Sequence, residues 1–155
     1  MRLLTKMLSI ATLALTSACA TQPKVAHEAE ATQDIARRVQ LLLDRYSRND
    51  QAGVVAMLDP ETFTMLGTSF NEKVRSQSEL RAFMDRDFAQ WQSASFTDAR
   101  DFDVRSDGTL ATAYFVVTFK AGSGPTLPVR LTTTWHKVDG EWLLTQSSSA
   151  LPPQQ

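Results

Sequence analysis

The sequence is poor in the residues that support disulfides and transition-metal sites. It contains one cysteine and 2 histidines in 155 residues. A single thiol cannot form an intramolecular disulfide, so the fold must depend on an apolar core. The two histidines, His27 and His136, lie far apart in the sequence, and without further cysteine ligands they give little support to a zinc or iron site. The sequence therefore predicts no metal and no other cofactor.

A large charge of one sign is also missing. The chain has 16 basic and 17 acidic side chains, for a formal net charge of −1 at pH 7. Nucleic-acid binding requires a basic patch that can meet the phosphate backbone. We therefore expect no nucleic-acid partner.

The apolar segment at the N-terminus has the three parts of a secretory signal. Arg2 and Lys6 give a positive start, residues 7–15 form a short apolar core, and small residues lead to Cys19. The core is too short for a stable transmembrane span. Because Ser-Ala directly precedes the cysteine, the segment resembles a bacterial lipobox. The alternative is an ordinary signal peptide that happens to contain a cysteine.

The lipobox resemblance implies that residues 1–18 are a lipoprotein signal peptide and that Cys19 is lipidated and becomes the mature N-terminus. Ala20, rather than Asp, follows the cysteine, which in this resemblance implies an outer membrane lipoprotein facing the periplasm. Each buried methylene of the acyl chains would contribute about 0.8 kcal/mol to the anchor. Residues 19–31 lack large apolar periodicity and are expected to form a flexible tether. The folded domain is expected over 32–153.

The first half of this domain has the patterns of helices. Apolar residues recur at helical spacing over 32–47, which predicts a first helix there. A short second helix is expected over 52–58, and a short strand lies near 63–70. Ser76 and Glu79 have the spacing of a capping box and predict the start of a third helix.

The second half has the period of strands. Two Asp-Gly pairs, at 107–108 and 139–140, favour tight hairpin turns between alternating apolar and polar residues. Helices followed by an antiparallel meander predict an α+β domain. The four predicted strands span 96–105, 109–120, 127–138 and 142–149.

Three pieces of the sequence occur together in an order typical of one family. Residues 130–144 read RLTTTWHKVDGEWLL, Glu72 follows Leu-Gly-Thr at 66–68, and Asn-Asp at 49–50 follows the first helix. With the element order, they resemble the SnoaL-like domains of the nuclear transport factor 2-like superfamily over 32–153. The resemblance implies a cone, in which a strongly curved antiparallel sheet wraps a long N-terminal helix and leaves a pocket at its open end.

The chain departs from its relatives at the places that carry acid–base chemistry. The family often has histidines at the fourth and sixth places after the hairpin tryptophan, and here those places hold Gln146 and Ser148. Neither of these two places therefore holds a side chain that titrates near neutral pH. The ketosteroid-isomerase relatives need a carboxylate base, a tyrosine and a protonated aspartate. The corresponding places hold residues 65–67, Leu42 and Thr133, so the sequence names no catalytic residue.

Other polar residues have ordinary structural interpretations. Asp85 and Asp87 are expected on the polar side of the third helix, near Arg81 and Arg86. His136 is expected to face water, because an isolated polar residue in an alternating strand usually does.

The last strand is expected to supply the ligand-binding residues. Side chains alternate along a strand with period two, so Leu144, Gln146 and Ser148 would share one side. In the family that side faces the cone interior, and Trp135 on the neighbouring strand would flank them. Gln146 offers a donor and an acceptor, Ser148 a hydroxyl, and the tryptophan apolar area. The alternative is a filled core in which backbone or water satisfies the two polar groups.

Two classes of function remain open. The first is a non-catalytic module of the bacterial envelope that binds a small apolar ligand or a partner protein. The second is a hydrolase, isomerase or cyclase whose substrate supplies most of the reactivity. The missing acid–base groups favour the first, whereas a buried carboxylate with a raised pKa would favour the second. We also expect a homodimer through the exposed sheet face, where Thr132, Thr134 and His136 suit a wet interface.

The lipid anchor can be tested by Cys19→Ala. We expect the variant to accumulate as unprocessed precursor or as soluble periplasmic protein, because the acceptor sulfur is missing. Cell fractionation and the mass of the mature protein measure this. A processed variant that stays membrane-bound would contradict the lipobox.

Overall fold

The computed structural model describes residues 22–151, and for residues 22–27 only the backbone. The predicted signal peptide and the predicted lipidation at Cys19 lie outside these residues. No helix within 22–151 is both long enough and apolar enough to cross a membrane.

A six-stranded sheet forms one side of the molecule, with the strand order β2-β1-β6-β5-β4-β3. The last four strands in the chain pair antiparallel as a meander, as predicted. The first short strand, β1, differs from the expectation of an all-antiparallel sheet, because it pairs parallel to β6. The strands are β1 (Thr64–Leu66), β2 (Lys73–Val74), β3 (Ala94–Ser106), β4 (Leu110–Ala121), β5 (Thr126–Val138) and β6 (Glu141–Ala150).

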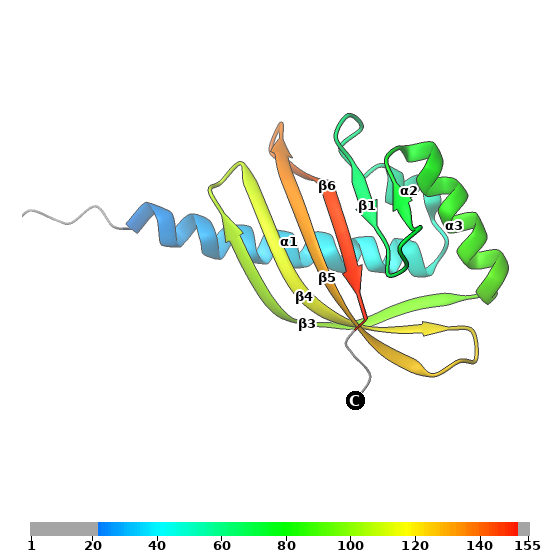
Figure 1. Cartoon of the computed structure of the whole chain (residues 1–155). Coiled ribbons are helices and arrows are strands. Elements are labelled where there is room, and N and C mark those ends of the chain that lie inside the picture. The colour runs from blue at the N-terminus through cyan, green and yellow to red at the C-terminus, as the bar shows by residue number, and fades with distance from the viewer. Residues whose placement is uncertain (1–21, 152–155) are drawn as a thin grey trace, which may run out of the picture.

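The long helix α1 (Gln22–Ser47) runs across the curved sheet, and its N-terminal end projects beyond β3 (Figure 1). Ile35 and Val39 are fully buried between helix and sheet. The predicted α+β fold, with a curved sheet across a long N-terminal helix, is confirmed. The helix begins at Gln22 rather than near Thr32, so the second part of the predicted tether is helical. This stretch is rich in Ala and Glu, which are strong helix formers.

Two shorter helices follow. The helix α2 (Gln51–Val55) begins after Asp50, whose carboxylate accepts a hydrogen bond from the Gly53 N–H at 2.8 Å. The helix α3 (Gln77–Trp91) begins after Ser76, whose hydroxyl oxygen accepts from the Glu79 N–H at 3.1 Å. Hydrogen bonds of this kind satisfy N–H groups that have no partner inside the helix. The predicted start of the third helix is therefore confirmed.

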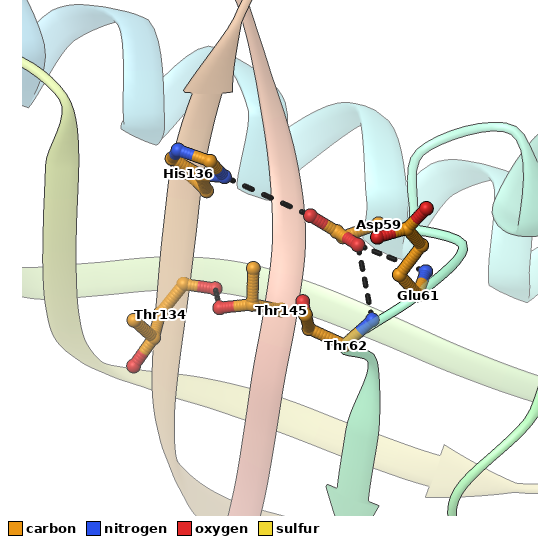
Figure 2. A network of polar contacts seen from close by, with 6 residues as sticks. All are labelled: Asp59, Glu61, Thr62, Thr134, His136 and Thr145. Carbon is orange, nitrogen blue, oxygen red and sulfur yellow. Dashed lines mark hydrogen bonds and ion pairs between the residues drawn. The ribbon is translucent and has the colours of Figure 1, made fainter.

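A one-residue bulge in β6 decides which side chains face α1. Trp135 of β5 lies opposite Leu144, but the next residue, Thr134, lies opposite Gln146, so Thr145 is the extra residue. The Thr145 hydroxyl donates to the Thr134 carbonyl at 3.0 Å, as Figure 2 shows. A bulge of this kind reverses the side on which the following residues point.

The segment before β1 holds β6 in place at this bulge. The Leu144 N–H donates to the Met57 carbonyl at 2.8 Å, and the Asp59 N–H donates to the Leu144 carbonyl at 2.9 Å. Both backbone groups of Leu144 therefore form hydrogen bonds with a segment that lies far away in the sequence. After the bulge, β6 pairs with β1 instead of with the segment around Met57 and Asp59.

Candidate functional site

A cavity of about 440 Å³ lies between the concave face of the sheet, the C-terminal part of α1 and α3. Ligand pockets in proteins commonly enclose about 300–1,000 Å³. The hairpin that joins β1 to β2 contributes to the wall. Most of the wall is apolar, and its aromatic side chains are Tyr46, Phe63, Phe83, Trp91, Phe96, Phe115 and Phe119.

The bulge at Thr145 separates the residues that were predicted to bind a ligand. Leu144 lines the cavity, but Gln146 and Ser148 pair with residues whose side chains point to the outer face. The prediction that these three residues share one side of the strand is therefore wrong. Their places on the wall are taken by two serines that the sequence analysis did not select, Ser147 and Ser149.

Trp135 is fully buried in the core and is not a wall residue. Its indole N–H donates to the Thr133 hydroxyl at 2.9 Å, and Thr133 does line the cavity. The ligand-binding roles of Trp135, Leu144, Gln146 and Ser148 stay predictions. The geometry supports direct contact only for Leu144.

The most polar part of the wall is a hydrogen-bonded pair from two helices. The hydroxyl of Tyr46 on α1 donates to Oδ2 of Asp87 on α3. The Asp87 side chain is buried, with a residue exposure of 8%, whereas the sequence placed it on the polar side of its helix. The Tyr46 ring packs against Phe88 and Phe96, with centroid distances of 5.8 and 5.4 Å. These contacts fix the hydroxyl toward the carboxylate.

Burial changes the acidity of both groups. Desolvation raises the pKa of Asp87, and the negative charge of Glu72 raises it further. The Tyr46 hydrogen bond and the positive charge of Arg86 act in the opposite direction but do not cancel this effect. Burial, with the bond to Asp87, also raises the pKa of Tyr46 above its usual range. Tyr46 is therefore a neutral donor at physiological pH, and Asp87 accepts a proton more readily than an exposed aspartate does.

Glu72 reaches the same cavity from the hairpin between β1 and β2. Its Oε2 accepts from the Ser69 N–H at 3.0 Å and from the Thr68 hydroxyl at 3.4 Å. Gly67 allows this arrangement, because a Cβ at that position would lie 2.5 Å from the Cβ of Glu72. The Leu-Gly-Thr motif and Glu72, which supported the family resemblance, thus build one wall of the cavity.

A signal for Asp87 was present in the sequence. Leu80, Met84, Asp87 and Trp91 follow one another at spacings of four, three and four residues, which places all four on one face of a helix. The other three members of this face are apolar. A single carboxylate at an apolar position indicates either an unfavourable core residue or a functional group.

A second buried carboxylate lies outside the cavity. Asp59 accepts at 3.0 Å from the N–H groups of both Glu61 and Thr62, and its Oδ2 lies 3.7 Å from Nδ1 of His136 (Figure 2). Desolvation acts to raise the pKa of Asp59, but these hydrogen bonds outweigh it and lower the pKa. His136, expected to face water, is 45% exposed and faces this carboxylate. The hydrogen bonds to Glu61 and Thr62 hold the turn before β1.

Within residues 22–151, no three His, Cys, Asp or Glu side chains come close enough together to hold a metal ion. The ionisable side chains of the cavity wall are Tyr46, Asp87 and Glu72.

The cost of burying Asp87 can be measured with Asp87→Asn. The raised pKa means that the ionised carboxylate is less favourable in the folded protein than in the unfolded chain. The asparagine keeps an oxygen for the Tyr46 hydroxyl and removes the charge. We therefore expect a larger free energy of unfolding than wild type at pH 7. This gain should shrink as the pH falls through the raised pKa, and urea denaturation at several pH values measures it.

Asp59→Asn is the matched control and should act in the opposite direction. The lowered pKa of Asp59 means that its ionised form stabilises the folded protein above the unfolded-state pKa. We expect a loss of about 1 kcal/mol at pH 7, the usual net contribution of one intramolecular hydrogen bond. The loss should disappear as the pH falls through the lowered pKa. Changes of the same sign in both variants at pH 7 would contradict the assignment.

Known proteins share this architecture. The profile of the SnoaL-like domain matches residues 35–153. An NTF2-like protein of unknown function from Pseudomonas putida KT2440 is 14% identical, with a TM-score of 0.70, over 82% of this chain and 90% of that chain. A proposed dehydratase of the NTF2-like family from Streptomyces avermitilis is 12% identical, with a TM-score of 0.70, over 81% of this chain and 99% of that chain.

A proposed scytalone dehydratase from Novosphingobium aromaticivorans is 12% identical, with a TM-score of 0.68, over 83% of this chain and 89% of that chain. At such identities these likenesses show the fold alone. No curated protein matches the sequence. The family profile, in contrast, spans the cavity-lining part of α1 and all six strands, and on this basis the chain belongs to the SnoaL-like domain family.

Proposed function

We propose that this protein binds a small, largely apolar molecule in the cavity beneath its sheet. The observation that carries the proposal is the cavity itself, which combines a volume of about 440 Å³ with an apolar, aromatic wall and a few polar groups. Sites for small molecules have this composition, because apolar area supplies affinity and a few polar atoms fix orientation.

The proposed setting is the bacterial envelope. The charged start, the short apolar core and the Ser-Ala-Cys end support a lipoprotein anchored through Cys19 in the outer membrane and facing the periplasm. A homodimer through the outer face of the sheet is part of the same proposal. It is supported by the exposed side chains of Leu110 and Tyr114, which lie opposite His136 and Thr132.

Two leucine substitutions on adjacent residues of β6 test where the ligand binds. Ser147→Leu puts a larger side chain into the cavity, whereas Gln146→Leu makes the same kind of change on the outer face. With the neutral fluorescent probe N-phenyl-1-naphthylamine, we expect Ser147→Leu to weaken binding at least tenfold. Gln146→Leu should leave the affinity within about twofold of wild type.

Thermal denaturation of each variant shows whether the fold is intact. If Ser147→Leu does not fold, Ser149→Leu makes the equivalent change further along the same wall. Loss of probe binding in Gln146→Leu, with normal binding in the serine variants, would place the site on the outer face and overturn the proposal.

Acid–base catalysis in the same cavity is the second candidate function. The observation that favours it is the Tyr46–Asp87 pair, because a buried carboxylate with a raised pKa is a functional-site candidate. Asp87 could remove a proton from a substrate carbon once the single Tyr46 O–H turns from Oδ2 of Asp87 to donate to a substrate oxygen. Isomerase or dehydratase chemistry has these requirements. Two solved structures with this fold are described as proposed dehydratases.

Proton exchange in D₂O tests this candidate without a known substrate. If Asp87 acts as a base, the protein should accelerate deuterium incorporation next to the carbonyl of a small aromatic ketone such as β-tetralone, followed by NMR. Asp87→Asn should reduce this acceleration by about a hundredfold or more, in the range usual for loss of a general base. Equal exchange rates for wild type and Asp87→Asn would exclude the candidate and leave ligand binding standing.

A further inference from the structure

The cavity wall carries charge of one sign only. Its ionisable side chains, apart from the neutral Tyr46, are the two carboxylates Asp87 and Glu72. Among the described residues that line it, none is Lys, Arg or His. An anionic molecule would therefore meet repulsion in a site partly withdrawn from water, where charges interact strongly.

Asp87 is buried without the cation that usually accompanies such a group. Buried carboxylates are normally paired, because an isolated charge is costly to remove from water. The ion pairs found among residues 22–151 include neither Asp87 nor Glu72. The nearby Arg86 is exposed, and its guanidinium lies 5.7 Å from the centre of the Phe83 ring.

Each carboxylate keeps one oxygen free for a ligand. The Tyr46 hydroxyl binds Oδ2 of Asp87, and the Thr68 and Ser69 donors bind Oε2 of Glu72. No described residue donates a hydrogen bond to Oδ1 of Asp87 or to Oε1 of Glu72. Tyr46, Asp87 and Glu72 all line the same cavity, and the negative charge of Glu72 raises the pKa of both other groups.

Aromatic rings surround this region. Phe83 and Trp91 lie one helical turn before and one turn after Asp87 on α3, and both line the cavity. Tyr46 and Phe96 also line the cavity and contact each other, with ring centres 5.4 Å apart. The faces of such rings attract cations, and their area also buries apolar groups.

We propose that the ligand of this cavity is an organic cation, an apolar ring or chain that bears a protonated amine placed between Asp87 and Glu72. The proposal rests on the proposed binding function and names the chemical class of its ligand. The ammonium supplies the cation that Asp87 lacks, and its N–H groups bind the two free carboxylate oxygens. The apolar part packs against the aromatic side chains of the cavity wall.

Three probes that differ in one substituent test the charge preference. They are 1-naphthylmethylamine, 1-naphthalenemethanol and 1-naphthoic acid, which carry the same rings with a positive, a neutral and a negative group at pH 7. Titration calorimetry on the wild-type protein should show the amine binding at least tenfold more tightly than the alcohol. The acid should bind most weakly.

Charge-removing variants identify the residues responsible. Glu72→Gln and Asp87→Asn should each reduce amine affinity about tenfold while the affinity for the alcohol changes less than twofold. Asp85→Asn is the matched control, because it makes the same change on the exposed face of the same helix and should leave amine affinity unchanged.

The outcomes separate this proposal from the one on which it rests. Equal affinity for amine and alcohol, or an amine affinity that Glu72→Gln and Asp87→Asn do not reduce, overturns the cationic ligand and leaves the apolar cavity as the binding site. If the acid binds most tightly, the ligand is an anion and the proposal is wrong. If neither the three probes nor N-phenyl-1-naphthylamine binds, both proposals fail together.

Discussion

The hydrogen bonds around the Thr145 bulge determine what kind of site this domain can form. Strand β6 must satisfy backbone groups of the segment near Asp59 at one end and of β1 at the other. The bulge allows the strand to pair with both. The Thr145 hydroxyl stabilises the bulge by donating a hydrogen bond to the Thr134 carbonyl. As a result, Ser147 and Ser149 face the cavity, and a strand without the bulge would present a different wall.

The packing of α1 against the sheet supplies the free energy that offsets the cost of an unfilled cavity. Ile35, Val39 and Phe115 are almost completely buried, and each side chain of this size contributes about 1.5–3 kcal/mol when fully buried. The buried carboxylate of Asp87 and the unfilled volume beside it both oppose folding. The free energy gained by burying this apolar layer therefore has to offset the cost of the site. Functional sites commonly destabilise the fold in this way.

The sequence was sufficient for the features that depend on local patterns. Ser76 and Glu79 fixed the start of α3, and hairpin turns with alternating residues defined the four long strands. The parallel pairing of β1 with β6 could not be predicted, because it joins segments far apart in the chain. The bulge at Thr145 has no glycine or other local signature. The sequence therefore predicted Gln146 and Ser148 on the wall, whereas Ser147 and Ser149 line it. Asp87 could have been found, since its helical spacing places it on an apolar face.

The length of α1 determines how far apart its two ends lie. A helix rises about 1.5 Å per residue, so its 26 residues span about 39 Å. The cavity lies around Leu42, Leu43 and Tyr46 near the C-terminal end of this helix, whereas the N-terminal end projects past β3 (Figure 1). The N-terminal end of α1 and the cavity therefore lie at opposite ends of the helix. A copy attached through the N-terminal end of α1 would therefore hold its cavity away from the point of attachment.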